Sequence, residues 1–481
     1  MKNNVFQKFV LYRWRFLIGF SVLAILTVAL AAYRFWDFPD GLISAEMTAA
    51  TTSGGFSLTN IFALESDQLI NLPWTVLQSF SIKLFGFNTF AFRLPAVILM
   101  ILTAIGLIWT IYKWFNKKSV ALTSGFLIVP SMMFMSLARG GDGSVMVVFL
   151  MTLALFSATM ALYGKSGLTR FIAKVGVCLA LSLLLYSVGG IYVVLVLIIA
   201  GMIHPKTRLI FLRTKPWKLA VGGIFGLAIL SPMIMNLVLG DRDIVWTLLA
   251  SGGWSMENLR SASAVFTGIS SGFVAGIITP IFSVVGLIFA VIGLMKIYEN
   301  FFSARSYLLP ALLLMTVALL IYQSQLIAFI FVPLALLMAI GVEVVLSSWL
   351  TLFPLSSYAR LLATILVGVL LVINGWLSIS YYFASISHDE TAVYNYNGEF
   401  EATRAFLAEQ KDQKFNLVVN EKDVDFYQNM TREFSNLTVI TGVNDESKMI
   451  VLTSADKNIE KIPTEIITSS RAKNPVLLRV Y

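Results

Sequence analysis

Three acidic side chains follow the first long apolar run of this chain. Asp37, Asp40 and Glu46 lie together in the segment FWDFPDGLISAEM. A carboxylate within hydrogen-bond reach of a hydroxyl or an amine can accept its proton while that group attacks an electron-poor carbon. Asp40 is the candidate for such a base, whereas the same acidic segment is also typical of a solvated loop.

Several arginine side chains could complete this chemistry. A leaving phosphate develops negative charge, which arginine stabilises through charge-assisted hydrogen bonds. The candidates are Arg93, Arg139, Arg242 and Arg260. Arg93 and Arg139 could instead extend to the bilayer surface. Arg242 could pair with the aspartates beside it in GDRDIVW.

The composition indicates an integral membrane protein. Of the 481 residues, 58% are hydrophobic and 13% are charged, and the mean hydropathy is +0.82. Apolar runs of about 20 residues recur, and each can cross ~30 Å of hydrocarbon as a helix. Their continuity is unlike the alternation of barrel strands. We predict about eleven crossings, at Arg15–Ala32, Leu94–Lys113, Ser119–Leu137, Ser144–Tyr163, Phe171–Tyr186, Gly190–His204, Trp217–Leu239, Ser271–Lys296, Tyr307–Tyr322, Leu326–Leu350 and Leu361–Phe383.

Basic residues predict how these helices are oriented. Lysine and arginine recur before the first crossing and in every second loop after it, which predicts that this side is cytoplasmic. The extracytoplasmic side of the plasma (inner) membrane then receives the loops 33–93, 138–143 and 240–272 and the tail after Phe383. The net charge of +9 follows from this pattern and from contacts with membrane lipids, so it predicts no nucleic-acid partner.

The polar tail predicts a second domain. Residues 1–386 are expected to form the transmembrane module, with interfacial helices in the first outer loop 33–93, and residues 387–481 a small extracytoplasmic α/β domain. In the tail, NGEFEATRAFLAEQKD has the apolar spacing of a helix, and five short β-type runs follow it. A glycine-rich phosphate loop and a catalytic triad are missing from it, which favours a lid or a partner surface.

A series of motifs surrounds the second crossing. A proline-containing start and an interfacial helix precede Lys83-Leu84-Phe85-Gly86, then Asn88, then Arg93-Leu94-Pro95. In this order the segment 71–115 resembles the GT-C glycosyltransferases of the protein O-mannosyltransferase and lipid A aminoarabinose transferase type.

The resemblance extends to both sides of this segment. The family has an aspartate at the start of the first outer loop and a glutamate six residues later, as Asp40 and Glu46 have here. It also has an acidic residue at the outer junction of the third and fourth crossings, where this chain has Asp142 with Arg139 nearby in LARGGDGSV.

Two positions depart from the family pattern. Gly41 replaces the glutamate that usually follows the aspartate, and Ile70-Asn71-Leu72-Pro73 replaces a Glu-Lys-Pro-Pro motif. The second change removes a glutamate that helps to bind metal in some relatives, so a divalent metal stays an open question and no other cofactor is expected. One cysteine, Cys178, and two histidines, His204 and His388, exclude an intrachain disulfide and a metal site built from several of these residues.

The resemblance implies a polytopic α-helical GT-C fold and an inverting glycosyltransferase (EC class 2.4) of the cell envelope. It would move a sugar from a polyprenyl-phosphate donor to a lipid, protein or glycan acceptor at the extracytoplasmic face. Asp40 and Asp142 would be catalytic, and the residues expected to bind the donor phosphate or the substrate are Glu46, Arg93, Arg139, Arg242 and Arg260.

Two other classes of protein stay open. A non-catalytic scaffold with the same fold would explain Gly41 and the missing glutamate. A lipid or solute transporter would carry ionisable residues near the middle of its crossings, and Glu343 is the most central one found.

Overall fold

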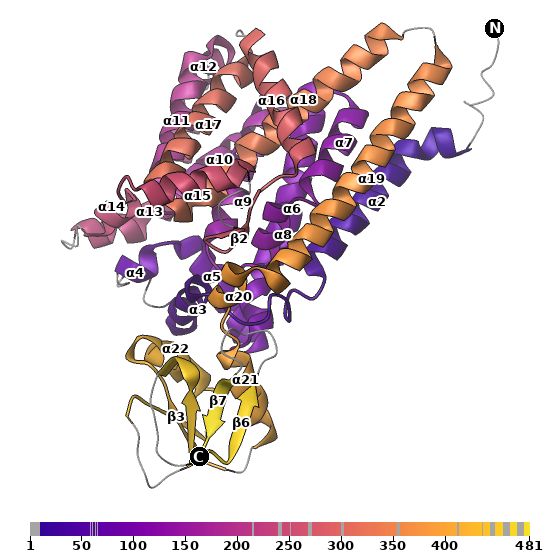
Figure 1. Ribbon diagram of the computed structural model, residues 1–481. Helices are drawn as coiled ribbons and strands as arrows, with labels where there is room; N and C mark the ends of the chain where they lie inside the picture. Colours follow the sequence, from indigo (N-terminus) through magenta and orange to yellow (C-terminus); the bar gives the residue numbers. More distant parts are fainter. Residues whose placement is uncertain are drawn as a thin grey trace.

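The chain is mostly helical, with a small sheet at its C-terminal end. The computed structural model describes residues 10–481 except for 58, 60, 63, 65, 214–215, 239–242, 251, 268–271, 300–302, 354–355, 411–412, 435, 443–447, 456–461 and 469–475. Figure 1 shows the long helices as one bundle and the sheet at one end of it.

The helices follow the apolar runs of the sequence. Those up to the last long helix are α2 (Val10–Ala32), α3 (Ser44–Gly55), α4 (Ser66–Leu69), α5 (Leu72–Phe85), α6 (Thr89–Phe115), α7 (Lys118–Ile128), α8 (Met132–Arg139), α9 (Ser144–Tyr163), α10 (Gly167–Leu184), α11 (Gly190–Ile203), α12 (Pro205–Leu212), α13 (Pro216–Val238), α14 (Asp243–Leu248), α15 (Met256–Thr267), α16 (Val284–Glu299), α17 (Ala304–Tyr322), the 3-10 helix η2 (Ser324–Ile330), α18 (Phe331–Leu352) and α19 (Ser357–His388).

The helical membrane fold is confirmed, but the number of crossings is not. Among the described residues, eight helices are long and apolar enough to cross a membrane, or nine if the bent pair α7 and α8 is one crossing. α11 has 14 residues and is shorter than the others. These helices indicate a multi-pass membrane protein.

The third predicted crossing, Ser119–Leu137, is wrong as a single straight helix. α7 and α8 meet at an angle of 65°. Pro130 lies at the break and has no backbone N–H to continue the helix. The Ser131 hydroxyl accepts the Phe134 N–H at 3.3 Å, which starts α8 as a separate helix.

The predicted crossing Ser271–Lys296 begins too early. Its helix, α16, starts at Val284, and the apolar residues before it form a buried hairpin of β1 (Phe273–Val274) and β2 (Ile277–Ile278). The Ser136 hydroxyl of α8 accepts the Ile278 N–H at 3.2 Å. These residues are apolar because they pack inside the protein, which a hydropathy pattern does not distinguish from burial in lipid.

The C-terminal part contains a five-stranded sheet with helices beside it. The strands are β3 (Phe415–Val418), β4 (Leu437–Ile440), β5 (Met449–Leu452), β6 (Glu465–Thr468) and β7 (Val476–Val480), in the order β4-β3-β5-β7-β6. β3 pairs in parallel with β4 and β5, and β7 pairs antiparallel with β5 and β6. The helices are α20 (Glu390–Asn395), α21 (Glu399–Glu409) and α22 (Val424–Met430), with the short turns η3 (Glu421–Asp423) and η4 (Thr453–Ala455).

The loop 33–93 and the sheet domain share a hydrophobic core. Phe87 and Phe92 pack against Phe400 and Phe426 of the C-terminal part. The ring centroid of Phe87 lies 5.9 Å from that of Phe400 and 5.3 Å from that of Phe426, and the centroid of Phe92 lies 5.8 Å and 6.4 Å from the same two rings. Polar bonds accompany this core, including one of 2.7 Å from Arg432 to the Gly54 carbonyl. The sheet domain is therefore attached to the loop that contains the acidic candidates.

Candidate active site

Arg93 is the centre of a buried polar cluster. Asn88 caps α6 by accepting the Ala91 N–H at 2.8 Å, and Arg93 follows in the next turn with an exposed fraction of 0%. Its guanidinium binds both oxygens of Glu46, with Nε–Oε1 at 3.1 Å and Nη2–Oε2 at 3.0 Å. A charge this deeply buried requires such a partner, because an unpaired ion loses its hydration without compensation.

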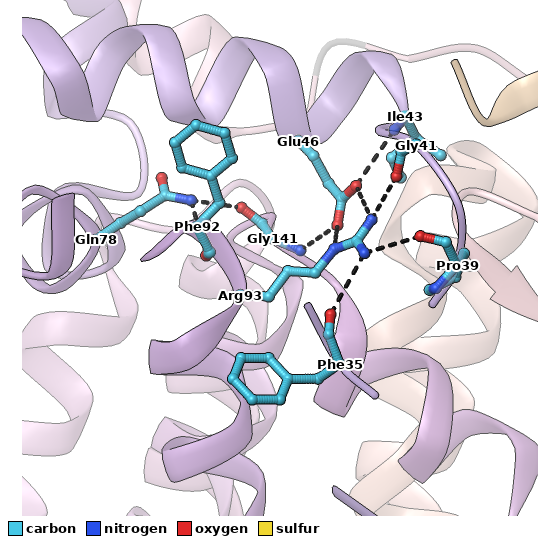
Figure 2. Close-up of polar contacts among 9 residues, drawn as sticks. All are labelled: Phe35, Pro39, Gly41, Ile43, Glu46, Gln78, Phe92, Arg93 and Gly141. Atoms are coloured by element: carbon cyan, nitrogen blue, oxygen red, sulfur yellow. Dashed lines mark hydrogen bonds and ion pairs between the residues drawn. The ribbon is translucent and has the colours of Figure 1, made fainter. Parts of the chain in front are cut away.

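The same guanidinium organises the acidic loop. Nη1 donates to the carbonyls of Phe35 at 3.4 Å and Pro39 at 2.9 Å, and Nη2 donates to the carbonyl of Gly41 at 2.6 Å. Figure 2 shows these bonds converging on Arg93. Since a guanidinium has five N–H donors, the five bonds of Arg93 use its full capacity.

Glu46 connects this loop to a second one. Its carboxylate accepts the Gly141 N–H at 2.5 Å and the Ile43 N–H at 3.2 Å, the latter at the start of α3. Gln78 of α5 donates to the Gly141 carbonyl at 2.9 Å (Figure 2). We call Arg93, Glu46 and the backbone groups that they bind the Arg93–Glu46 clamp.

Asp40 lies between two residues that the clamp holds. The Pro39 and Gly41 carbonyls are both bound to Arg93, whereas the side chain of Asp40 is exposed. In the part of the chain that the structure describes, the Asp40 carboxylate has no hydrogen bond or ion pair. Asp37 is exposed too, but it pairs with Arg34. The backbone on both sides of Asp40 is thus held in place, while its carboxylate is exposed and has no hydrogen-bond partner among the described residues.

Asp142 directly follows Gly141, whose backbone N–H is bound by Glu46 in the clamp. The N–H and the hydroxyl of Ser144 donate to its Oδ2, the N–H at 3.3 Å. Burial raises the pKa of the Asp142 carboxyl above its usual value, the bonds from Ser144 oppose this effect, and the charge of Glu46 adds to it. One buried ion pair therefore holds the two segments that contain the predicted catalytic acids.

The raised pKa of Asp142 predicts how stability changes with pH. Because the folded-state pKa of Asp142 lies above the unfolded-state value of about 3.9, ionisation of this carboxyl opposes folding. The free energy of unfolding therefore falls as the pH rises from the unfolded-state pKa through the folded-state pKa. We expect Asp142→Asn to raise the melting temperature relative to wild type more at about pH 7 than at about pH 4. Thermal unfolding in detergent at both pH values measures this. Asp37→Asn is the control and should show no such gain.

Arg139 lies at the end of α8 and is 1% exposed. Its Nη1 and Nη2 donate to the carbonyls of Met135 and Tyr33, both at 3.2 Å, and its guanidinium carbon lies 5.2 and 5.4 Å from the ring centroids of Tyr382 and Phe383. Within the described residues its buried Nε has no hydrogen-bond partner. Arg139 therefore has an N–H donor that is not used within the described residues, whereas all five donors of Arg93 are used.

The structure describes only one of the other two predicted arginines. Arg242 is outside the described residues. Arg260 is exposed on α15, and the bonds of the Arg93–Glu46 clamp do not involve it. In the described ranges no group of three or more His, Cys, Asp or Glu side chains is arranged to hold a metal ion.

Two residues near the clamp were not predicted from the sequence. Burial raises the pKa of Tyr396 well above its usual value, and the charges of Glu46 and Asp142 add to this effect. Burial also raises the pKa of Glu401, and the neighbouring Thr89 and the charge of Arg93 oppose this effect, whereas the charge of Asp40 adds to it. Both residues come from the C-terminal part, and the local sequence contains no motif that marks them.

Comparisons with known proteins agree with this architecture. A family model described as dolichyl-phosphate-mannose-protein mannosyltransferase matches residues 72–235, a range that includes Arg93, Arg139 and Asp142. The structure is similar to ArnT from Cupriavidus metallidurans bound to undecaprenyl phosphate, with a TM-score of 0.56 and 13% identity over 96% of this chain and 98% of ArnT.

The chain has the GT-C fold. This was the resemblance noted in the sequence, and it is confirmed. A second structure with the GT-C fold, the Archaeoglobus fulgidus oligosaccharyltransferase tethered to an acceptor peptide, matches with a TM-score of 0.52 and 13% identity over 89% of this chain and 64% of that protein. No curated protein sequence matches this chain. Proteins with the GT-C fold in these comparisons are glycosyltransferases.

Proposed function

We propose that this protein is an inverting glycosyltransferase that moves a sugar from a polyprenyl-phosphate donor to a lipid, protein or glycan acceptor at the extracytoplasmic face of the plasma (inner) membrane. The observation that carries the proposal is the Arg93–Glu46 clamp, which fixes the backbone around Asp40 while its carboxylate stays exposed. The undecaprenyl phosphate bound to ArnT supports the class of donor.

The chemistry follows from the two acids. Asp40 accepts the proton of the acceptor hydroxyl or amine as this group attacks the anomeric carbon, and the bond to the donor phosphate breaks. A single displacement of this kind inverts the anomeric configuration. Asp142 lies on the second segment that the clamp holds, and we propose that it orients the acceptor beside Asp40.

Arg139 is the best candidate for the cation that stabilises the leaving phosphate. Arg93 uses all its donors within the protein, so we propose that it positions the Asp40 loop instead of binding the donor. Arg139 is buried with an unused Nε donor. Charge-assisted bonds to a leaving phosphate strengthen as its charge develops.

The alternative that this protein is a transporter depended mainly on Glu343, and the structure pairs this residue with a cation. Glu343 pairs with Lys117 at 2.8 Å, directly before the start of α7. The charge of Glu343, which lies on α18, is thus compensated by Lys117 rather than unpaired.

The proposed topology places the first outer loop and the C-terminal domain on the same side. The loop 33–93 and residues 387–481 share a core, so they cannot lie on opposite sides of a bilayer. Protease added to intact spheroplasts should cleave the C-terminal domain, whereas an N-terminal tag should be cleaved only after lysis. Cleavage of the N-terminal tag in intact spheroplasts would contradict the proposed orientation.

The reaction itself is tested with purified protein in nanodiscs. Donors with different sugars on polyprenyl phosphate are offered together with membrane lipids and cell-wall glycans from the source cell. Release of polyprenyl phosphate that depends on both donor and acceptor supports the proposal. Absence of release with every donor, from protein that is folded by thermal unfolding, favours the scaffold.

Arg139→Gln tests the assignment of the phosphate-binding cation. We expect kcat/KM to fall by about 100-fold, because a charged donor near the transition state is lost. The control is Arg260→Gln, which changes an exposed residue on α15 and should leave kcat/KM within about threefold. Equal losses in the two variants would contradict the assignment of Arg139.

A further inference from the structure

The segment that enters the C-terminal domain forms a bridge with the loop that contains Asp40. Leu42 and Asn397 exchange both backbone hydrogen bonds, each 2.9 Å long, in an antiparallel pair. Leu42 is fully buried. Asp40 is therefore held from two directions, by Arg93 of α6 and by a backbone segment that lies 357 residues later in the chain.

Gly41 is the residue that allows this approach. Its φ is +92°, a conformation that favours glycine. A Cβ at this position would lie 2.5 Å from the carbonyl carbon and oxygen of Asn397 and 2.7 Å from the nitrogen of Gly398. The space that a glutamate would need at position 41 is thus filled by the backbone of the C-terminal segment.

The same segment brings three further side chains to the site. Tyr396 lies near the charges of Glu46, Arg93 and Asp142. Phe400 packs against Phe92, the residue before Arg93, with ring centroids 5.8 Å apart. Glu401 directly follows Phe400 and lies near Thr89, which is one helical turn before Arg93 on α6.

We propose that residues 396–401 are part of the catalytic centre and act as a latch that positions Asp40, and that Gly41 is an adaptation to this latch rather than a sign of lost activity. Tyr396 and Asn397 are positioning residues in this view. Glu401 brings an acidic side chain near enough to Asp40 for the two charges to interact. The inference rests on the proposed glycosyl transfer only for its effect on activity.

A disulfide tests the latch without any substrate. In a hydrogen-bonded antiparallel pair the Cα atoms are about 5.5 Å apart, which suits a disulfide. We replace the single cysteine by Cys178→Ser and introduce Leu42→Cys with Asn397→Cys. Mild oxidation should link the two peptides, as detected by mass spectrometry. The control pair, Leu42→Cys with Tyr394→Cys, should link far less, and equal linkage in both pairs would overturn the latch.

Activity then shows whether the closed latch is the working state. The linked protein should keep at least about half of the activity of its reduced form, since the productive geometry is already fixed. Loss of activity on oxidation that is restored by reductant would overturn the proposal. If wild type shows no transfer with any donor, the proposed function fails while the linkage result still decides whether the latch exists.

Substitution of Gly41 opens the latch. We expect Gly41→Ala to lower kcat by about 100-fold, the scale expected when a reacting group is misplaced by roughly 1 Å, with the KM for the donor unchanged. Gly41→Glu, which restores the family residue, should be at least as inactive. The control is Gly55→Ala, where an added Cβ meets nothing within 4 Å. Activity at the wild-type level in Gly41→Glu would overturn the inference.

Discussion

Asp40→Asn is expected to lower the rate of sugar transfer by about 100- to 10,000-fold, the range for loss of a general base. Asparagine has nearly the same shape as aspartate but cannot accept the proton of the attacking group. The fold should be unchanged, because the clamp binds the backbone of Pro39 and Gly41 and not the Asp40 side chain. Release of polyprenyl phosphate in nanodiscs measures the rate, and thermal unfolding measures the fold.

Asp37→Asn is the matched control for this variant. Asp37 lies on the same loop, is exposed like Asp40 and pairs with Arg34. A surface ion pair of this kind contributes little, so activity should stay within about threefold of wild type. Two outcomes would contradict the role of Asp40: transfer by Asp40→Asn at more than about a tenth of the wild-type rate, or an equal loss in Asp37→Asn.

Glu46→Gln is expected to destabilise the protein strongly. It leaves the guanidinium of Arg93, which is 0% exposed, without its negative partner. Removing one member of a buried pair costs about 3–5 kcal/mol. The variant should unfold at a clearly lower temperature in detergent and lose activity, because the segments on both sides of the clamp lose their common attachment.

The double variant Glu46→Leu with Arg93→Met separates these two effects. Replacing both charges by apolar side chains removes the unpaired ion, so part of the stability should return. Activity should stay low, because methionine cannot bind the carbonyls of Pro39 and Gly41. Arg34→Ala, which breaks the exposed pair with Asp37, should leave the melting temperature unchanged. If Glu46→Gln melts like wild type, the buried pair is not what holds the loops.

The sequence was sufficient for the fold class because most of its information is in long apolar runs. It failed where an apolar run packs inside the protein. The hairpin of β1 and β2 is apolar because it is buried among other elements of the protein, α8 among them. The break at Pro130 is visible in the sequence, but proline also occurs inside the continuous helices α6 and α13. Neighbouring helices decide whether the chain bends there.

Only part of the candidate site could be predicted from the sequence. The spacing of Asp40 and Glu46 and the position of Arg93 are local features, so a family pattern can find them. The pairing of Glu46 with Arg93, and of Leu42 with Asn397, depends on contacts between distant segments. The prediction that Glu46 and Arg93 bind substrate stays untested, and the role that we propose for them is to hold the Asp40 loop in place. Gln78 could have been noticed as the single amide side chain in the segment LPWTVLQSFSIKLF.

The aromatic contacts of Phe87 and Phe92 with Phe400 and Phe426 also limit how this protein can be divided. A fragment that begins after α19 would expose Phe400 and Phe426, which Phe87 and Phe92 cover in the whole protein. Chimeras between relatives should therefore exchange the first loop and the C-terminal region as one unit. In the proposed orientation, the seam between them is also where a small molecule or an antibody could inhibit the protein from outside the cell, without having to enter the lipid.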